Sequence, residues 1–317
     1  MKKRFLFSLS LLSAICLTTC TRKVSLEWSA EEFETFILPP GGVEIAPGLF
    51  YDRQEITVRD WWEYLHWIRD VYGTKSAEFK AALPLTSVWG VPYRCLERLE
   101  KEYFTSGPYA DFPIVGVSRA QAVAYAKWRA DRILELILRH FEAIPFHPDP
   151  GPRNHFTIER YLSGKYRRCA PHPALARYIH YRLPSEEDWK KAKAYNEEVL
   201  RRYQKECQLD CEEPVNAGQN PCTQESVIRL PVASAGSGIL PDSLKYIRHL
   251  SGNIAEWSAT PGVTLGGSWF HKPADVAQYV LFRADKPNAW TGFRLVAEYR
   301  EVGYRSLGGG LNRTSTN

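Results

Sequence analysis

Three segments of the chain carry the pattern of an amphipathic helix, and each starts at a capping box. In each, a serine or threonine stands three positions before a residue that can return a hydrogen bond to the cap backbone. The pairs are Thr57 with Asp60, Ser118 with Gln121, and Ser185 with Asp188. We therefore expect helices over about 58–72, 118–142 and 186–195, with no internal repeat between them.

Shorter elements are expected around these helices. Residues 47–57 alternate like a half-buried strand, and residues 75–112 are typical of a long packed loop with short elements. From about residue 214 onward, glycine, proline and serine separate short extended runs. The helix over 118–142 is close to twice the mean helix length, so it should project beyond the core or support an insertion.

The composition indicates a packed globular protein. Aromatic residues make up 13% of the chain and include ten tryptophans, far more than a disordered polypeptide carries. The formal net charge of +5 falls to +2 once the three basic residues at positions 2–4 leave with the N-terminal signal. Because the remaining charges are mixed in sign, no global field favours nucleic acid as a partner.

The N-terminus is typical of an export signal, with three basic residues ahead of an apolar run over 5–17 that is too short to span a bilayer. The sequence LTTC (17–20) resembles a bacterial lipobox, in which the signal is cut before the cysteine and the cysteine is acylated. We expect a signal peptide over 1–19, a lipid on Cys20 and a tether over 20–39. Thr21, rather than Asp, indicates an outer-membrane address. The alternative is an ordinary secretory signal that is cut nearby.

Five cysteines remain after Cys16 and Cys20 are set aside, at positions 95, 169, 207, 211 and 222. In an oxidising compartment some of them should pair, and the cluster of Cys207, Cys211 and Cys222 predicts a disulfide that closes a loop. The same cluster lacks the C-x-x-C spacing and the fourth ligand of a zinc site.

Six blocks of the sequence occur in the order found in the formylglycine-generating-enzyme domain, also called the sulfatase-modifying factor domain. They are FYDRQEITVRDWWEYLHW (50–67), FPIVGVSRAQAVAYAKW (112–128), YRLPSEEDW (181–189), LSGNIAEW (250–257), GGSW (266–269) and TGFRLV (291–296). The chain resembles this family over about residues 40–300. The resemblance implies an α+β fold, irregular, loop-rich and C-type-lectin-like in outline, followed by a flexible C-terminal tail over 301–317.

A narrower resemblance concerns the stretch that follows the start of the second helix. The segments 128–138 and 156–166, and the alanine at position 255, look like those of gliding-motility and type IX secretion lipoproteins, which share this fold. The resemblance implies an inserted segment over about 131–180, and we expect the helix over 118–142 and residues 145–180 to contact partners. It also implies a lipid-anchored, periplasm-facing protein of the outer membrane that binds other subunits of a secretion or motility assembly.

Active members of the family oxidise a substrate cysteine with a copper ion held by two cysteines near the GGSW turn. The matching positions of this chain are His271 and Val276. Copper(I) is retained by soft thiolates, and one imidazole beside an aliphatic side chain does not replace them. The resemblance therefore implies a pseudoenzyme with no catalytic residues.

The family also carries calcium near the block that here reads GNIAEW. Carried onto this sequence, Gly252 and Ile254 would offer carbonyl groups and Glu256 a carboxylate, ligands that suit a hard cation. The fourth position is His249, and an imidazole is a poor calcium ligand, so the implied calcium site is weakened. The alternative is that Glu256 accepts hydrogen bonds from nearby backbone and that the glycine turn is structural.

Three functions follow from these observations. The favoured one is a non-catalytic lipoprotein that acts as a scaffold in a type IX secretion or gliding-motility complex. The second is a formylglycine-type oxidase with an unrecognised metal site. The third is a lipoprotein that binds glycan or peptidoglycan, suggested by the lectin-like outline and by Trp61, Trp62 and Trp67, although most of these tryptophans are expected in the core.

Overall fold

A computed structural model describes residues 38–302 except 92, 106, 174, 208–213, 223–231, 239 and 279–280. The predicted signal peptide, the acylation site Cys20, most of the tether and most of the C-terminal tail lie outside the described residues. Within the described part, no helix combines the length and the apolar character needed to cross a membrane.

The larger sheet has four antiparallel strands in the order β1-β2-β8-β3. The strands are β1 (Gly42–Ala46), β2 (Leu49–Asp52), β3 (Arg177–Arg182) and β8 (Val296–Glu301). The expected strand over 47–57 is only partly right, because Pro47 and Gly48 form the turn between β1 and β2. Gly48 has a φ of +70°, a conformation that glycine adopts readily and that turns the chain back.

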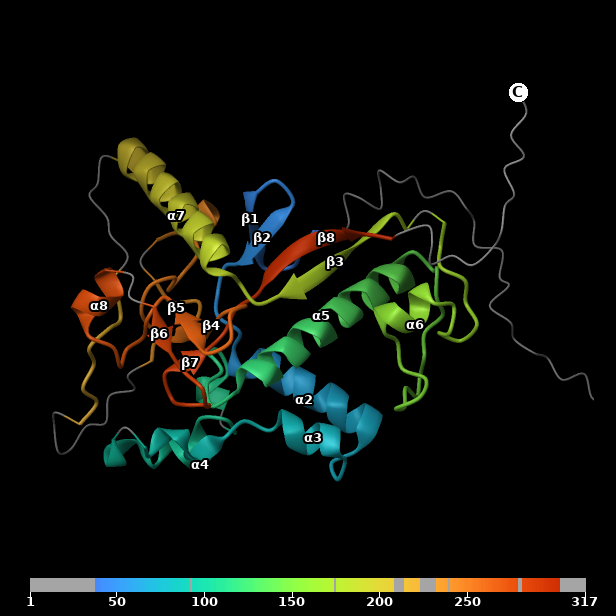
Figure 1. The fold of residues 1–317 in the computed structure, drawn as a ribbon, viewed down its shortest axis with the longest axis horizontal. Helices are drawn as coiled ribbons and strands as arrows, with labels where there is room; N and C mark the ends of the chain where they lie inside the picture. The colour runs from blue at the N-terminus through green and yellow to red at the C-terminus, as the bar shows by residue number, and fades with distance from the viewer. Residues whose placement is uncertain are drawn as a thin grey trace, which may run out of the picture.

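The smaller sheet is built from very short strands in the order β6-β5-β4-β7. They are β4 (Ala255–Trp257), β5 (Val263–Leu265), β6 (Phe282–Arg283) and β7 (Thr291–Gly292), and β4 pairs with β7 in parallel. Figure 1 shows this sheet at one end of the molecule, beside the start of α5 (Arg119–His140). β4 ends the block LSGNIAEW, GGSW follows β5 directly, and β7 starts the block TGFRLV. These short strands agree with the short extended runs expected after residue 214.

All three predicted capping boxes are present. They start α2 (Val58–Tyr72), α5 and α7 (Glu186–Cys207), the last through mutual hydrogen bonds between Ser185 and Asp188. α7 runs twelve residues beyond the predicted end at 195. In this extension Glu198 pairs with Arg201 and Arg202, its neighbours on the helix surface, and such pairs stabilise a helix.

Short helices connect these elements. They are α3 (Ala77–Ala82), α4 (Leu99–Glu102), α6 (Ile158–Leu162) and α8 (Pro273–Ala277), with single 3-10 turns at Thr86–Trp89, Arg94–Leu96, Gly107–Tyr109 and Asp242–Leu244. The stretch 75–112 therefore has the irregular character that its sequence predicts.

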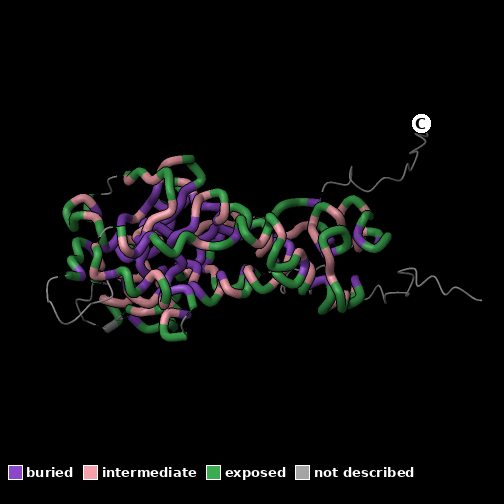
Figure 2. The backbone as a smooth tube through the Cα atoms, turned by 90° about the horizontal axis from the view of Figure 1, so that it is seen from below, coloured by how far each residue is buried: buried purple, intermediate pink, exposed green. Residues whose placement is uncertain are grey.

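The molecule is elongated, and most buried positions gather in its larger end (Figure 2). α5 extends from this end toward α6, so it supports the inserted segment as its length predicts (Figure 1). Trp61 is 1% exposed in the core, and Trp62 and Trp67 pack against it.

Both ends of the predicted insertion over about 131–180 lie in regular elements that continue outside it. Residues 177–180 form the first part of β3, which pairs with β8 over six residues and buries Ile179 and Tyr181. They belong to the main sheet because their pairing partner is the penultimate segment of the chain, which the local sequence does not reveal. Residues 131–140 are likewise part of α5.

Candidate functional site

Two glycine turns bring the sequence blocks LSGNIAEW and GGSW together. Gly252 has a φ of +83°, and a Cβ there would lie 2.7 Å from the carbonyl oxygen of Asn216. Gly267 has a φ of +71°, and a Cβ there would lie 2.6 Å from Cγ2 of Val276. Both positions therefore require glycine. The backbone N–H of Trp269 donates to the carbonyl of Asn253 at 2.9 Å, which holds the two turns side by side.

A buried ion pair lies beneath these turns. Arg294 Nε donates to Glu256 Oε1 at 2.5 Å, and both side chains are completely shielded from solvent. The other guanidinium nitrogens of Arg294 donate to backbone carbonyls of Asp52, Arg248 and His249. A charged pair this deep is tolerated only when its hydrogen-bonding groups are largely satisfied, and Arg294 meets that condition.

Glu55 joins the same cluster through Asn253. The side-chain amide of Asn253 donates to Glu55 Oε1 at 2.9 Å, while its Oδ1 accepts from the backbone of Ala233. Burial raises the pKa of the Glu55 carboxyl to about 7, against the opposing influence of Arg294. Burial also raises the pKa of Glu256, and again Arg294 acts against the rise.

The charges of the cluster do not balance. Asp52 forms a buried ion pair with Arg129 at 2.8 Å, and Glu256 forms one with Arg294, which leaves Glu55 without a cation of its own. Oε2 of Glu55 is buried and has no hydrogen-bond partner within the described part of the chain, and the same holds for Oε2 of Glu256. An uncompensated carboxylate is costly in such surroundings, which is why Glu55 keeps its proton up to a pH of about 7.

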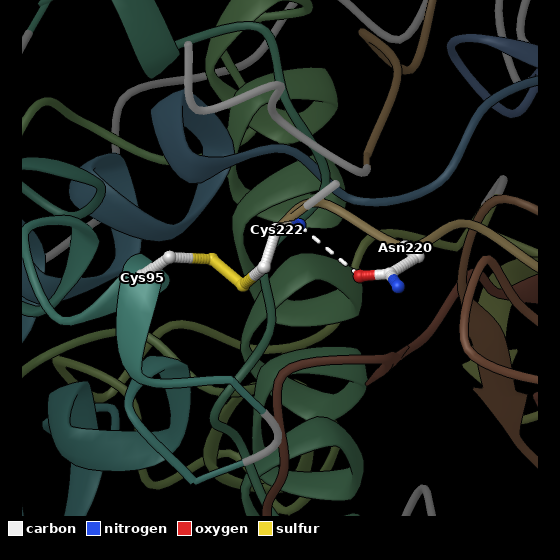
Figure 3. The surroundings of a disulfide bond; sticks show 3 residues. All are labelled: Cys95, Asn220 and Cys222. Atoms are coloured by element: carbon white, nitrogen blue, oxygen red, sulfur yellow. Dashed lines mark hydrogen bonds between the residues drawn. A yellow bond between two sulfur atoms is a disulfide. The ribbon is translucent and has the colours of Figure 1, made fainter. Parts of the chain in front are cut away.

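The structure corrects the predicted disulfide. Cys222 is bonded to Cys95, which lies 127 residues earlier in the chain, and not to a cysteine of its own cluster. Figure 3 shows the bond, with the backbone N–H of Cys222 donating to Oδ1 of Asn220 at 3.1 Å. Cys169 is also disulfide-bonded. Cys211 and the side chain of Cys207 lie outside the described residues.

A comparison with protein-family models identifies the family to which this chain belongs. The model described as the sulfatase-modifying factor enzyme 1-like domain matches residues 18–299, nearly the whole chain. The chain belongs to the sulfatase-modifying factor family. This membership confirms the irregular α+β fold that the six sequence blocks imply. A comparison with curated protein sequences gives no significant match.

Two solved structures show a distant likeness to this member of the sulfatase-modifying factor family. CarF is 15% identical in sequence with a TM-score of 0.36, over 79% of this chain and 86% of its own. Variable protein 1 of Treponema denticola is 15% identical with a TM-score of 0.37, over 79% of this chain and 84% of its own. At this similarity, neither structure bears on the activity of the chain.

The two positions that match the copper cysteines of the family follow the GGSW turn: His271 lies two residues after it and Val276 lies in α8. The ring of His271 stacks on Phe282 at a centroid distance of 3.7 Å, and its Nδ1 lies 2.8 Å from the hydroxyl of Ser268. Burial lowers the pKa of His271 to about 4, so the imidazole is neutral. Val276 is 2% exposed and packs against Gly267. These residues do not fit a two-thiolate copper site.

The residues expected to hold calcium do not fit a hard cation either. Glu256 is bound to Arg294, whose guanidinium also takes the carbonyls of Arg248 and His249. A fixed positive charge at this place repels a divalent ion. Among the described residues, no three histidine, cysteine, aspartate or glutamate side chains are grouped as metal ligands. Gly252 and Ile254 flank Asn253, whose backbone N–H donates to the carbonyl of Asn216 and whose own carbonyl accepts from Trp269.

Sequence reasoning singled out Glu256 but missed Glu55, Asp52 and Arg294. Glu55 and Arg294 both lie inside recognised blocks. Glu55 follows the exposed Gln54, but Arg294 stands between the buried apolar residues Phe293 and Leu295. An isolated charge in such a setting indicates a buried pair. The partner of each charge, 38 residues away for Arg294, comes only from the fold.

Proposed function

We propose that this protein is a non-catalytic lipoprotein scaffold that faces the periplasm from the outer membrane. It binds other subunits of a secretion or motility assembly of the type IX kind. The observation that carries the proposal is the pair of side chains at the copper positions. A neutral imidazole held by Ser268 and a buried isopropyl group offer no thiolate to a redox metal.

The shape of the molecule supports a binding role. The inserted segment lies at the end of α5, away from the glycine turns, and carries the exposed ring of Phe146, which is 62% accessible. It also packs Phe156, Tyr161 and Tyr166 into the hydrophobic core. Removing the segment would open that core, so single surface substitutions test its contacts better than a deletion does.

The test of the scaffold function is partner capture from outer membranes with the acylated full-length protein. We expect Phe146→Ser to reduce recovery of the co-purified subunits severalfold, because an exposed aromatic ring contributes strongly when it becomes buried at an interface. Val215→Ser is the matched control, since Val215 is 53% exposed at a different part of the surface. Recovery that contains no secretion or motility subunit would contradict the proposal.

The oxidase remains the second candidate to test directly. Purified protein should contain no stoichiometric copper after loading and dialysis, and it should leave the cysteine of a substrate peptide unoxidised in air. Tightly held copper together with peptide oxidation would replace the scaffold by an enzyme. The aromatic basis for glycan binding is weak, because Trp61 is buried and Trp62 and Trp67 pack against the core.

A further inference from the structure

A groove of about 860 Å³ lies between α5, α6 and β3. Its walls are mainly apolar and include Val123, Ala126, Ala130, Leu162, Tyr178 and Leu183. Figure 1 shows α5 running alongside β3, with α6 near the far end of the helix. The small side chains of Ala126 and Ala130 leave the space that a larger residue on α5 would fill.

The outer edge of β3 borders this groove. β3 is the last strand of its sheet and pairs with β8, and no other strand in the described part of the chain pairs with it. Consecutive residues over 180–183 line the groove. Since neighbouring side chains of a strand point to opposite faces, the backbone edge itself lies along the groove. An open edge of this kind is able to pair with another extended chain.

Asp131 gives the groove its chemical preference. It is 7% exposed, lines the groove from α5, and accepts the backbone N–H of Ile158 at 2.8 Å. No lysine or arginine of the described residues forms an ion pair with it. Burial raises the pKa of this carboxyl to about 6, so it is largely ionised at neutral pH. A buried anion in apolar surroundings favours a cationic group in whatever fills the groove.

The other charges that line the groove are of both signs. Glu159, exposed on α6, also lines it and has no ion-pair partner among the described residues. Two of the lining cations are already engaged: Arg182 with Asp188 and Glu298, and Arg119 with the carbonyls of Ser258 and Ala259. A third, Lys127, lies one helical turn before Asp131, and its charge acts to lower the pKa of that carboxyl without forming an ion pair among the described residues. Asp131 and Glu159, at the α6 end of the groove, can therefore each pair with a cation of a bound ligand.

We propose that the groove binds an extended segment of a partner protein, which pairs with the free edge of β3 and places a lysine or arginine on Asp131. The alternating side chains of the segment are apolar and rest on Ala126 and Ala130. This inference rests on the proposed scaffold function and names the kind of partner chain that the scaffold takes.

The test uses a phage-displayed library of random nonapeptides selected on the full-length protein. We expect the enriched peptides to alternate apolar residues and to carry one lysine or arginine. A synthetic copy should bind at least ten-fold more weakly to Asp131→Asn, which removes the charge but keeps an acceptor for Ile158, and to Val123→Trp, which fills the groove. Leu136→Trp is the matched control, because Leu136 is 59% exposed on the same helix and does not line the groove.

Backbone N-methylation of the synthetic peptide tests the pairing with β3. Methyl groups on alternate amides along one edge should abolish binding, whereas the same number along the other edge should leave it within two-fold. Enrichment of peptides without a cation, equal binding to Val123→Trp, or equal sensitivity of both edges would overturn the inference. If Asp131→Asn and Val123→Trp still recover all natural subunits, the groove assignment fails while the scaffold function stands.

Discussion

The two ends of α5 lie in regions that treat charge in opposite ways. At the glycine turns, Glu256 and Asp52 are each closed off by an arginine, and solvent does not reach the pair that Glu256 forms with Arg294. At the inserted segment, Asp131 and Glu159 border a groove without a cation of their own among the described residues. The buried acids at the glycine turns therefore stabilise the fold, whereas Asp131 and Glu159 at the inserted segment can still pair with a cation of a bound partner. Recognition is therefore expected at the inserted segment and not at the turns that match the catalytic region of the family.

The largest expected effect breaks the internal pair at the glycine turns. Arg294→Leu leaves Glu256 buried without a cation and removes donors from three carbonyls, so the free energy of unfolding should fall by about 3–5 kcal/mol. Urea denaturation followed by circular dichroism measures it. Arg300→Leu, at a half-exposed arginine of β8, should change stability very little. Equal effects of the two substitutions would mean that the internal pair does not anchor the fold.

The next prediction compares two leucines on α5 itself. Leu134 is 2% exposed, whereas Leu136 is 59% exposed two residues later. Leu134→Ala should cost about 2–4 kcal/mol through the cavity it leaves, and Leu136→Ala should stay within about 0.5 kcal/mol. Thermal unfolding of both variants checks this. A large loss with Leu136→Ala would show that this exposed face is covered in the native protein.

The pH dependence of the unfolding free energy should show the difference between the buried Glu55 and an exposed glutamate. Its pKa in the folded state is about 7, above the ordinary glutamate value of 4.5, so the folded protein binds more protons than the unfolded chain between these values. The contribution of Glu55 to stability is therefore fully present below about pH 4.5 and is lost as the pH rises through 7. Glu55→Gln should remove about 2 kcal/mol of this loss, measured as the difference in unfolding free energy between pH 5 and pH 8. Glu63→Gln, at an exposed site, should leave the profile unchanged, and an unchanged profile in Glu55→Gln would mean that Glu55 is ionised.

The smallest expected effect is a gain in stability, whereas the first two substitutions are expected to reduce it. Asp131→Asn removes a buried charge but keeps an oxygen for the N–H of Ile158, so at pH 8 the protein should become more stable by about 1 kcal/mol. Asp188→Asn should instead destabilise, because Asp188 pairs with Arg182 and caps α7. Chemical denaturation of the two variants side by side gives the comparison. A loss of stability in Asp131→Asn would make Asp131 a structural residue of α6 and weaken the case for the groove.

The family and the helix starts were predictable from the sequence for different reasons. The caps depend on hydrogen bonds between residues three positions apart, so Thr57 with Asp60 and Ser118 with Gln121 are readable locally. The family followed from six blocks in a fixed order. Gly252 and Gly267 could be expected to occupy special turns, but what each turn touches was not predictable.

Pairings between residues far apart in the chain could not be predicted from the sequence. Cys222 has nearer cysteines in the chain, yet the fold places it 6.0 Å from Cys95 between Cα atoms. Glu256 was expected to meet calcium or backbone, and the structure gives it Arg294 instead.

The sequence by itself determined the family, the capped helices and the side chains at the copper positions, since each depends on residue identity or on neighbours within a helical turn. Only the tertiary structure decided which cysteine Cys95 meets, which cation neutralises Glu256, and that β3 leaves an open edge beside Asp131. These features depend on contacts between segments far apart in the chain. Such contacts form only when distant segments pack together in the core, so the residues next to each partner in the sequence do not reveal them.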